Sequence, residues 1–277
     1  MKVVYRNFDV EQKSVQRFLN VDPLAEKYPF TSPYTYTNNN PIMLIDPTGM
    51  EPEDDHFNKY GRFMYRDNKK TNNVIIHTDK GNVRLSQLDY TKKGTRMAVS
   101  NIIAHYAGKK GLSGVYGVKT MKSHSTGAHT TPWKSVFFNS KALSAGKYDN
   151  FYNIRSTLDH EAGEKGHKSE NISPYTYIAH TQVYLDQAKS PDYGKSTEDY
   201  QSSIAFGFME RLWNSYEQKE ISWGKLGQYI DDFNANNTGG VKVIPIGGYD
   251  GPMDIYVDND GVKYTPTTAE KIKTPHE

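Results

Sequence analysis

The stretch Thr157-Leu158-Asp159-His160-Glu161-Ala162-Gly163-Glu164-Lys165-Gly166-His167 packs two histidines and two glutamates into eight residues. It follows an apolar run at the three-and-four spacing of one buried helical face, formed by Phe151, Ile154 and Leu158. The sequence therefore predicts a packed helix that ends in a cluster of side chains able to bind a metal.

This predicted helix begins after Asp149 or Asn150, either of which can serve as the N-cap. On the helix, His160 and Glu164 lie four residues apart and share a face, so both can bind one cation, while Glu161 points about 100° away. His-Glu-x-x-His metal sites have this arrangement, with two ligands one turn apart and a glutamate between them that acts as a base. Here the second ligand position carries Glu164 instead of histidine.

The position of His167 depends on where the helix ends. A continuous helix would place His167 roughly 10 Å along the axis from His160, too far for both to bind one metal. Gly163 and Gly166 favour a helix that ends here, and a turn at Gly166 would bring His167 back towards His160. The residues leave open whether Glu164 or His167 completes the site. They also leave open a frayed, charged helix end with a solvated histidine.

The composition excludes several kinds of site. The chain has 277 residues, a length for one large or two modest domains, and no cysteine, which excludes disulfides, thiolate metal sites and a cysteine nucleophile. Any metal must be held by histidine, carboxylate or carbonyl groups. A formal charge of +2 gives no electrostatic argument for nucleic acid or a membrane as partner. With 36% hydrophobic residues and 21 tyrosines, the core is expected to consist of amphipathic rings more than aliphatic side chains.

No targeting signal is visible in the sequence. Residues 1–9 lack an apolar signal core, and no run approaches the ~18 apolar residues of a membrane span. The sequence predicts a soluble protein without an N-terminal signal peptide, so that any export needs another route.

Residues 1–50 are rich in turn signals. Asp-Pro occurs at residues 22–23 and 46–47, Asn-Pro occurs at residues 40–41, and Gly49 is free to adopt a positive φ. Short extended pieces between turns are expected here, as at the end of a larger β structure.

The stretch from about residue 5 to residue 50 resembles the C-terminal end of the RHS repeat-associated core, the β shell of RHS and YD-repeat proteins. In that family the chain after the final Asp-Pro-x-Gly is a variable toxin, which the shell encloses and self-cleavage often releases. The two Asp-Pro-x-Gly elements fall on Asp22-Pro23-Leu24-Ala25, with alanine in place of glycine, and on Asp46-Pro47-Thr48-Gly49.

This resemblance implies an autoproteolytic role for Asp22 and Asp46. It also implies an upstream RHS shell, a cognate immunity protein and a type VI or similar secretion machinery. The protein would then be secreted or delivered into a competitor cell.

The chain is expected to divide into three segments. Residues 1–50 are the tail of the RHS core, and residues 51–72, which are charged, are an exposed connector. Residues 73–277 form the C-terminal toxin domain, with a helical part over about 149–236 and a β-rich tail over about 240–265.

Hydrophobic periodicity predicts an α+β fold for this C-terminal domain, with a small mixed or antiparallel sheet and a mainly helical part. The predicted elements are a hairpin over 73–77 and 82–85, a helix over 95–106, strands over 115–121 and 135–138, a helix that begins at Ser173-Pro174, helices over 197–219 and 223–234, and strands over 241–244, 255–257 and 262–264.

Three more histidines are candidates for the site. The polar loop over 122–132 carries His124 and His129, which can bind substrate if the loop lies near a metal-binding helix. His180 lies on the apolar face of the helix that follows. It is either a hydrogen-bonded core residue or a third ligand that faces His160, because consecutive helices joined by a short loop usually pack together.

Residues 149–190 resemble the metallopeptidase-like tails found behind RHS cores, in which a helix with His-Glu-x-x-His is followed by a helix with another histidine. The resemblance implies a zincin-like catalytic part and a zinc-dependent hydrolase that cleaves peptide or amide bonds. The roles that it implies are zinc ligand for His160, His180 and either Glu164 or His167, and general base for Glu161.

Two other classes of function remain open. One is a metal-dependent nuclease toxin, against which the near-neutral charge argues, because phosphate binding usually requires a basic stripe. The other is a non-catalytic binding toxin with a degenerate metal site.

Overall fold

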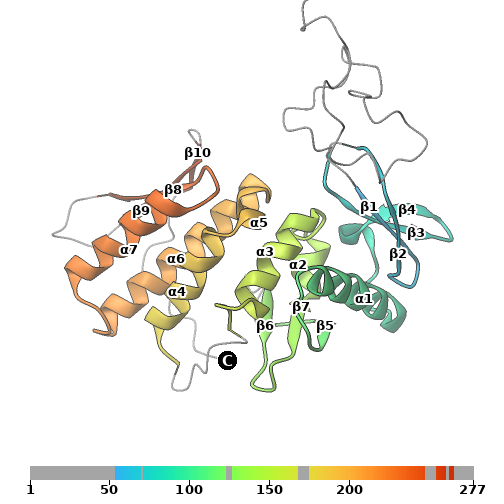
Figure 1. Cartoon of the computed structure of the whole chain (residues 1–277), viewed down its shortest axis with the longest axis horizontal. Coiled ribbons are helices and arrows are strands. Elements are labelled where there is room, and N and C mark those ends of the chain that lie inside the picture. Colours follow the sequence, from blue (N-terminus) through green and yellow to red (C-terminus); the bar gives the residue numbers. More distant parts are fainter. Residues whose placement is uncertain are drawn as a thin grey trace, which may run out of the picture. The chain divides into compact units, whose positions relative to one another are not determined.

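The computed structural model describes residues 54–69, 71–122, 127–167, 175–246, 254–259 and 262–264 (Figure 1). The segment that resembles an RHS core, with Asp22 and Asp46, lies outside the described residues, and so does His124. The chain divides into two units, and the described helices and strands all lie in the larger one, which comprises residues 53–67 and 71–277.

The first sheet has the strand order β2-β1-β3-β4. Its strands are β1 (Asp55–Asn58), β2 (Phe63–Arg66), β3 (Val74–Thr78) and β4 (Gly81–Arg84). β1 runs parallel to β3, and the other two pairs are antiparallel. The predicted hairpin of β3 and β4 is confirmed, with Thr78 opposite Gly81 at the turn, where Gly81 has a φ of 121°.

The prediction of an exposed connector over residues 51–72 is wrong for β1, which is buried, whereas the side chains of β2 are exposed. β1 is an inner strand, and its Phe57 is fully buried. Asp55 is also fully buried, where it accepts hydrogen bonds from Arg66 Nε at 2.5 Å and from the Tyr106 hydroxyl at 2.8 Å. The charged residues that indicated a solvated connector are therefore partly neutralised inside the fold.

A helix and a second small sheet follow. These elements are α1 (Lys93–Lys109), β5 (Tyr116–Lys119), β6 (Ala128–Thr130), β7 (Val136–Asn139) and the short α2 (Ser140–Ser144). The strand order is β5-β7-β6, in which β5 is parallel and β6 antiparallel to β7. Part of the predicted polar loop over 122–132 is therefore strand β6, and the loop prediction is wrong for that part.

The helical part comprises α3 (Phe151–Ala162), α4 (Tyr177–Ala188), α5 (Pro191–Gly194), α6 (Glu198–Glu217) and α7 (Trp223–Asn236) (Figure 1). Side-chain caps explain where four of these helices begin, since Asn150, Thr176, Thr197 and Ser222 each accept a backbone N–H of the first turn. Helix α4 was expected to begin at Ser173-Pro174. These residues lie outside the described ranges, and α4 begins after Thr176 instead.

A third, antiparallel sheet has the order β10-β9-β8 and comprises β8 (Lys242–Ile246), β9 (Asp254–Asn259) and β10 (Val262–Tyr264). These strands correspond to the three strands predicted for the tail. The fold is α+β, as the sequence predicted.

The core of the described residues combines aromatic and aliphatic side chains. The fully buried residues include Tyr148 and Tyr193, but also Ile154 and Leu158 of α3. The expectation of a core made of rings more than aliphatic chains is therefore only half right. None of the described helices is both long and apolar enough to cross a membrane.

Candidate metal centre

The C-terminal end of α3 reverses the chain direction within a few residues. The helix ends at Ala162, and His167 N–H then donates a hydrogen bond to the carbonyl oxygen of His160 at 2.9 Å. A Cβ on Gly166 would lie 2.6 Å from the carbonyl oxygens of both Asp159 and His160. The turn therefore requires glycine because the backbone passes close to the helix end, and it returns His167 to the side of His160.

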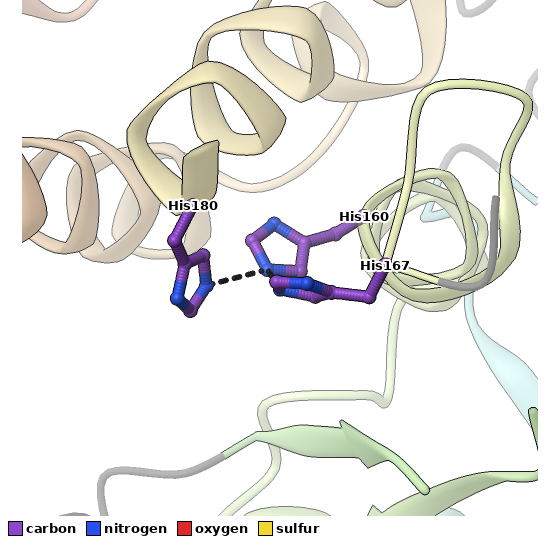
Figure 2. A group of neighbouring side chains, drawn as sticks. All are labelled: His160, His167 and His180. Carbon is purple, nitrogen blue, oxygen red and sulfur yellow. Dashed lines mark hydrogen bonds between the residues drawn. The ribbon is translucent and has the colours of Figure 1, made fainter. Parts of the chain in front are cut away.

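Three histidines meet next to this turn. His160 Nε2 lies 3.1 Å from His167 Nε2 and 3.2 Å from His180 Nε2. One ring nitrogen from each of the three lies within 4.8 Å of the other two. His160 comes from α3, His167 from the turn after it and His180 from the first turn of α4, and Figure 2 shows the three rings pointing toward one another.

The spacing of these nitrogens fits a single metal ion. Zinc–nitrogen bonds are about 2.0–2.1 Å long, so two nitrogens at tetrahedral positions lie roughly 3.4 Å apart. Two of the three separations, 3.1 Å and 3.2 Å from His160 Nε2, are close to that value. Three neutral imidazoles also suit zinc, which keeps a fourth position open in catalytic sites with three protein ligands. The donor set therefore fits a divalent metal such as zinc.

Gln187 on α4 orients the ring of His160. The amide nitrogen of Gln187 donates hydrogen bonds to the carbonyl oxygen of Ser156 and to the Tyr200 hydroxyl, both at 3.0 Å. Its Oε1 is therefore an acceptor, 2.9 Å from His160 Nδ1. With the proton on Nδ1, the Nε2 of His160 presents a lone pair to the centre of the group.

Two tyrosines complete the surroundings. The Tyr175 hydroxyl lies 2.8 Å from His180 Nδ1, so it can accept a hydrogen bond from Nδ1–H and leave the lone pair of His180 Nε2 free to bind a metal. The ring of Tyr184 lies 4.4 Å from that of His160 and stacks on His180 at 5.1 Å. Tyr184 thus contacts both imidazole rings, and Tyr175 contacts that of His180.

Burial favours the neutral form of all three imidazoles. Burial lowers the pKa of His160 and of His180 well below the ordinary value, and the neighbouring His167 adds to both shifts. Burial also lowers the pKa of His167 to about 4, with smaller contributions from His129 and Arg211. Neutral rings offer lone pairs, which is the form that binds metals.

Glu161 lies beside His160 on α3 and is almost completely buried. Its Oε2 accepts a hydrogen bond from the Thr130 hydroxyl of β6 at 2.5 Å, and the same hydroxyl lies 3.0 Å from the Glu161 carbonyl oxygen. Burial raises the pKa of Glu161 to about 7, although Thr130 opposes that shift. A carboxylate with this pKa is suited to accept and return protons near neutral pH.

The other candidate residues from the sequence lie elsewhere. Glu164 is exposed and lines a separate pocket with Asp159, Lys165 and Asp186, and the three histidines are not among its lining residues. His129 is on β6, next to Thr130, which contacts Glu161.

Sequence reasoning missed four residues that support the site, namely Thr130, Tyr175, Tyr184 and Gln187. A signal for two of them was present, since Tyr184 and Gln187 follow His180 at i+4 and i+7 and share its helical face. A glutamine on an apolar face requires a buried partner. Thr130 and Tyr175 carry no comparable pattern, because contacts across the fold place them.

Comparison with known families gives one match. A family described as metallopeptidase toxin 2 matches residues 55–242, which is more than half of the chain and includes all three histidines and Glu161. No curated protein and no solved structure matches the chain.

Proposed function

Because the chain belongs to the metallopeptidase toxin 2 family, it is a metal-dependent hydrolase, and we propose that it is a zinc peptidase whose metal is held by His160, His167 and His180. The observation that carries the proposal is the convergence of the three Nε2 atoms. The family favours this function over a nuclease and over a non-catalytic binding toxin.

The ligand set of the proposal resolves the choice that the sequence left open in favour of His167. This assignment is supported by the 3.1 Å separation from His160 and by the exposure of Glu164. Three neutral ligands also leave the full charge of the ion at the site, whereas a carboxylate ligand would reduce it.

The proposed reaction needs a Lewis acid, which the metal would supply, and a group that transfers protons, which is Glu161. A divalent metal at the three histidines supplies Lewis-acid chemistry, which polarises a substrate carbonyl and activates water. Glu161 takes the proton from the attacking water and then gives it to the departing amine. Its raised pKa, of about 7, suits both transfers, and Thr130 holds the carboxylate in place.

Strand β6 is suited to bind the substrate. It lies at the edge of its sheet among the described strands, and its Thr130 contacts Glu161 directly. An extended peptide can pair with such an edge through backbone hydrogen bonds, which would place one of its carbonyl groups beside the three histidines. His129 of the same strand is the candidate for a substrate contact.

The family match supports a toxin, and the RHS context rests on the resemblance of the upstream segment. We propose that residues 1–50 are the end of an RHS core, with Asp22 and Asp46 in autoproteolysis, and that the toxin domain follows. Such a toxin needs a cognate immunity protein in the producing cell and a secretion machinery that delivers it into a competitor cell.

The experiment incubates the zinc-loaded chain with a mixture of synthetic peptides and analyses the products by mass spectrometry. We expect cleavage by the wild type, a loss of roughly 100- to 10,000-fold in Glu161→Gln, and wild-type rates in the matched variant Glu164→Gln. Full activity of Glu161→Gln, or cleavage that survives removal of the metal by a chelator, would contradict the proposal.

A further inference from the structure

Helix α6 runs antiparallel to α4 along the metal centre. The carboxylate of Glu220, just after α6, accepts hydrogen bonds from Tyr177 N and Ile178 N at the start of α4, at 3.1 Å and 2.8 Å. The C-terminal end of α6 therefore lies at the N-terminal end of α4. Farther along, a Cβ on Gly207 would lie 2.7 Å from the Tyr184 hydroxyl, so these two positions are level with each other.

This arrangement places Arg211 beside His180. His180 lies one turn before Tyr184 on α4, and Arg211 lies one turn after Gly207 on the same face of α6. One turn advances each helix by about 6 Å, and the two advances point the same way because the helices are antiparallel. The backbone of Arg211 therefore lies next to His180, the third histidine of the centre.

The electrostatics support this placement. The positive charge of Arg211 contributes to lowering the pKa of His160, of His167 and of His180. It also lowers the pKa of Tyr175 and of Tyr184, opposing the effect of burial. All five groups around the centre therefore experience this cation.

The guanidinium has hydrogen-bonding capacity that its described neighbours do not use. Arg211 Nε is buried and has no hydrogen-bond partner among the residues that the structure describes. The carboxylate of Glu210 is 3.7 Å from Nη1, which is too long for a hydrogen bond. A buried donor without a partner is costly, so the site is built for a group that is not part of the described fold.

We propose that Arg211 binds a carboxylate of the substrate, next to the scissile bond. A guanidinium matches a carboxylate with two parallel hydrogen bonds, a geometry that lysine cannot provide. The inference rests on the proposed peptidase function and adds a substrate class to it, namely peptides with an acidic group within about one residue of the cleaved bond. The carboxylate is either the peptide's C-terminus or an aspartate or glutamate side chain.

Binding can be measured without cleavage. The full-length, zinc-loaded Glu161→Gln protein is dialysed against three N-acetylated tetrapeptide mixtures that contain no other acidic residues. The first mixture has free C-terminal carboxylates, the second has C-terminal amides, and the third has C-terminal amides with one internal glutamate. Retention of each mixture is quantified by mass spectrometry.

We expect at least one of the two acidic mixtures to be retained about tenfold more than the neutral one, and which of them it is identifies the source of the carboxylate. A second substitution, Arg211→Gln, removes the preference, Arg211→Lys weakens it, and the neighbouring Glu210→Gln leaves it intact. Equal retention of all three mixtures, or a preference unchanged by Arg211→Gln, would overturn the inference.

The comparison of mixtures on the protein with intact Arg211 requires no folded Arg211 variant. It also separates the two proposals. A wild type that cleaves no peptide but retains acidic peptides through Arg211 would refute the peptidase and leave the carboxylate site standing. A wild type that cleaves acidic and neutral peptides equally would support the peptidase and refute the carboxylate site.

Discussion

His160 Nε2 and His167 Nε2 lie 3.1 Å apart although the residues are seven positions apart in the chain. An unbroken helix would separate them by roughly 10 Å along its axis. The turn after α3 removes that separation, and the hydrogen bond from His167 N–H to the His160 carbonyl oxygen stabilises the turn. The centre therefore depends on the backbone of this turn as much as on the ligands.

Replacing Gly166 by alanine is the direct test of the turn. A Cβ at this position would lie 2.6 Å from two carbonyl oxygens, so the turn must open. We expect Gly166→Ala to lower the free energy of unfolding by about 1–3 kcal/mol and to weaken zinc binding, as measured by thermal unfolding and chelator competition. Gly108→Ala in α1, where the added methyl group meets no atom within 4 Å, is the control and should be neutral or slightly stabilising. Unchanged zinc affinity in Gly166→Ala would show that the turn does not position His167.

Gln187 is expected to tune the metal affinity through His160. Gln187→Met keeps the length of the side chain but removes the acceptor for His160 Nδ1–H. Partners of this kind typically contribute roughly 10- to 100-fold in metal affinity, and we expect a loss of that size. Gln182→Met on the same helix serves as the control, since Gln182 bonds to Asp186 and not to the three histidines. Equal zinc affinities of the two variants would contradict this role.

Lys147 should make the free energy of unfolding depend on pH in the alkaline range. Burial lowers its pKa, and the Tyr200 ring lies 5.4 Å from the ammonium. The folded protein therefore loses this proton at a lower pH than the unfolded chain, whose lysine keeps a pKa of about 10.4. Between these two values the unfolded chain binds more protons, so the contribution of Lys147 to stability rises with pH.

We therefore expect Lys147→Met to be more stable than the wild type near pH 7, with an advantage that shrinks as the pH approaches 10. Urea midpoints across this range measure the difference. The exposed Lys80→Met should show no such trend. A difference between Lys147→Met and the wild type that does not change with pH would rule out the linkage.

The start of the catalytic domain can be tested by truncation. A chain that begins at residue 54 retains β1, whose Phe57 is fully buried, and should fold and bind zinc. A chain that begins at residue 73, where the sequence alone placed the domain start, lacks β1 and the buried Asp55 and should fail to fold. Circular dichroism and zinc content distinguish the two, and a folded, zinc-binding chain from residue 73 would refute this boundary.

The sequence predicted α3 well because several local signals agree there. Phe151, Ile154 and Leu158 form one apolar face, and Asn150 caps the helix. The two glycines after the helix also indicated the turn, although not the reason for it. That reason is the close approach of the backbone to the helix end, which periodicity does not reveal.

The strands β1 and β2 could not be predicted in the same way. β1 has the sequence Asp-His-Phe-Asn, in which only Phe57 is apolar, and all side chains of β2 are exposed. Asp55 is buried because Arg66 and Tyr106 satisfy it, and Tyr106 is distant in the sequence. The contact of Thr130 with Glu161 is of the same kind, since only the fold brings β6 to α3.

Metal content is the most direct test of the three-histidine centre. Elemental analysis of the purified full-length chain should find roughly one zinc ion per chain in the wild type, and none in His160→Ala, His167→Ala or His180→Ala. Glu164→Ala should keep its zinc, because this side chain is exposed outside the group. Zinc that persists in His167→Ala but is lost in Glu164→Ala, or a wild type that binds none, would contradict the account.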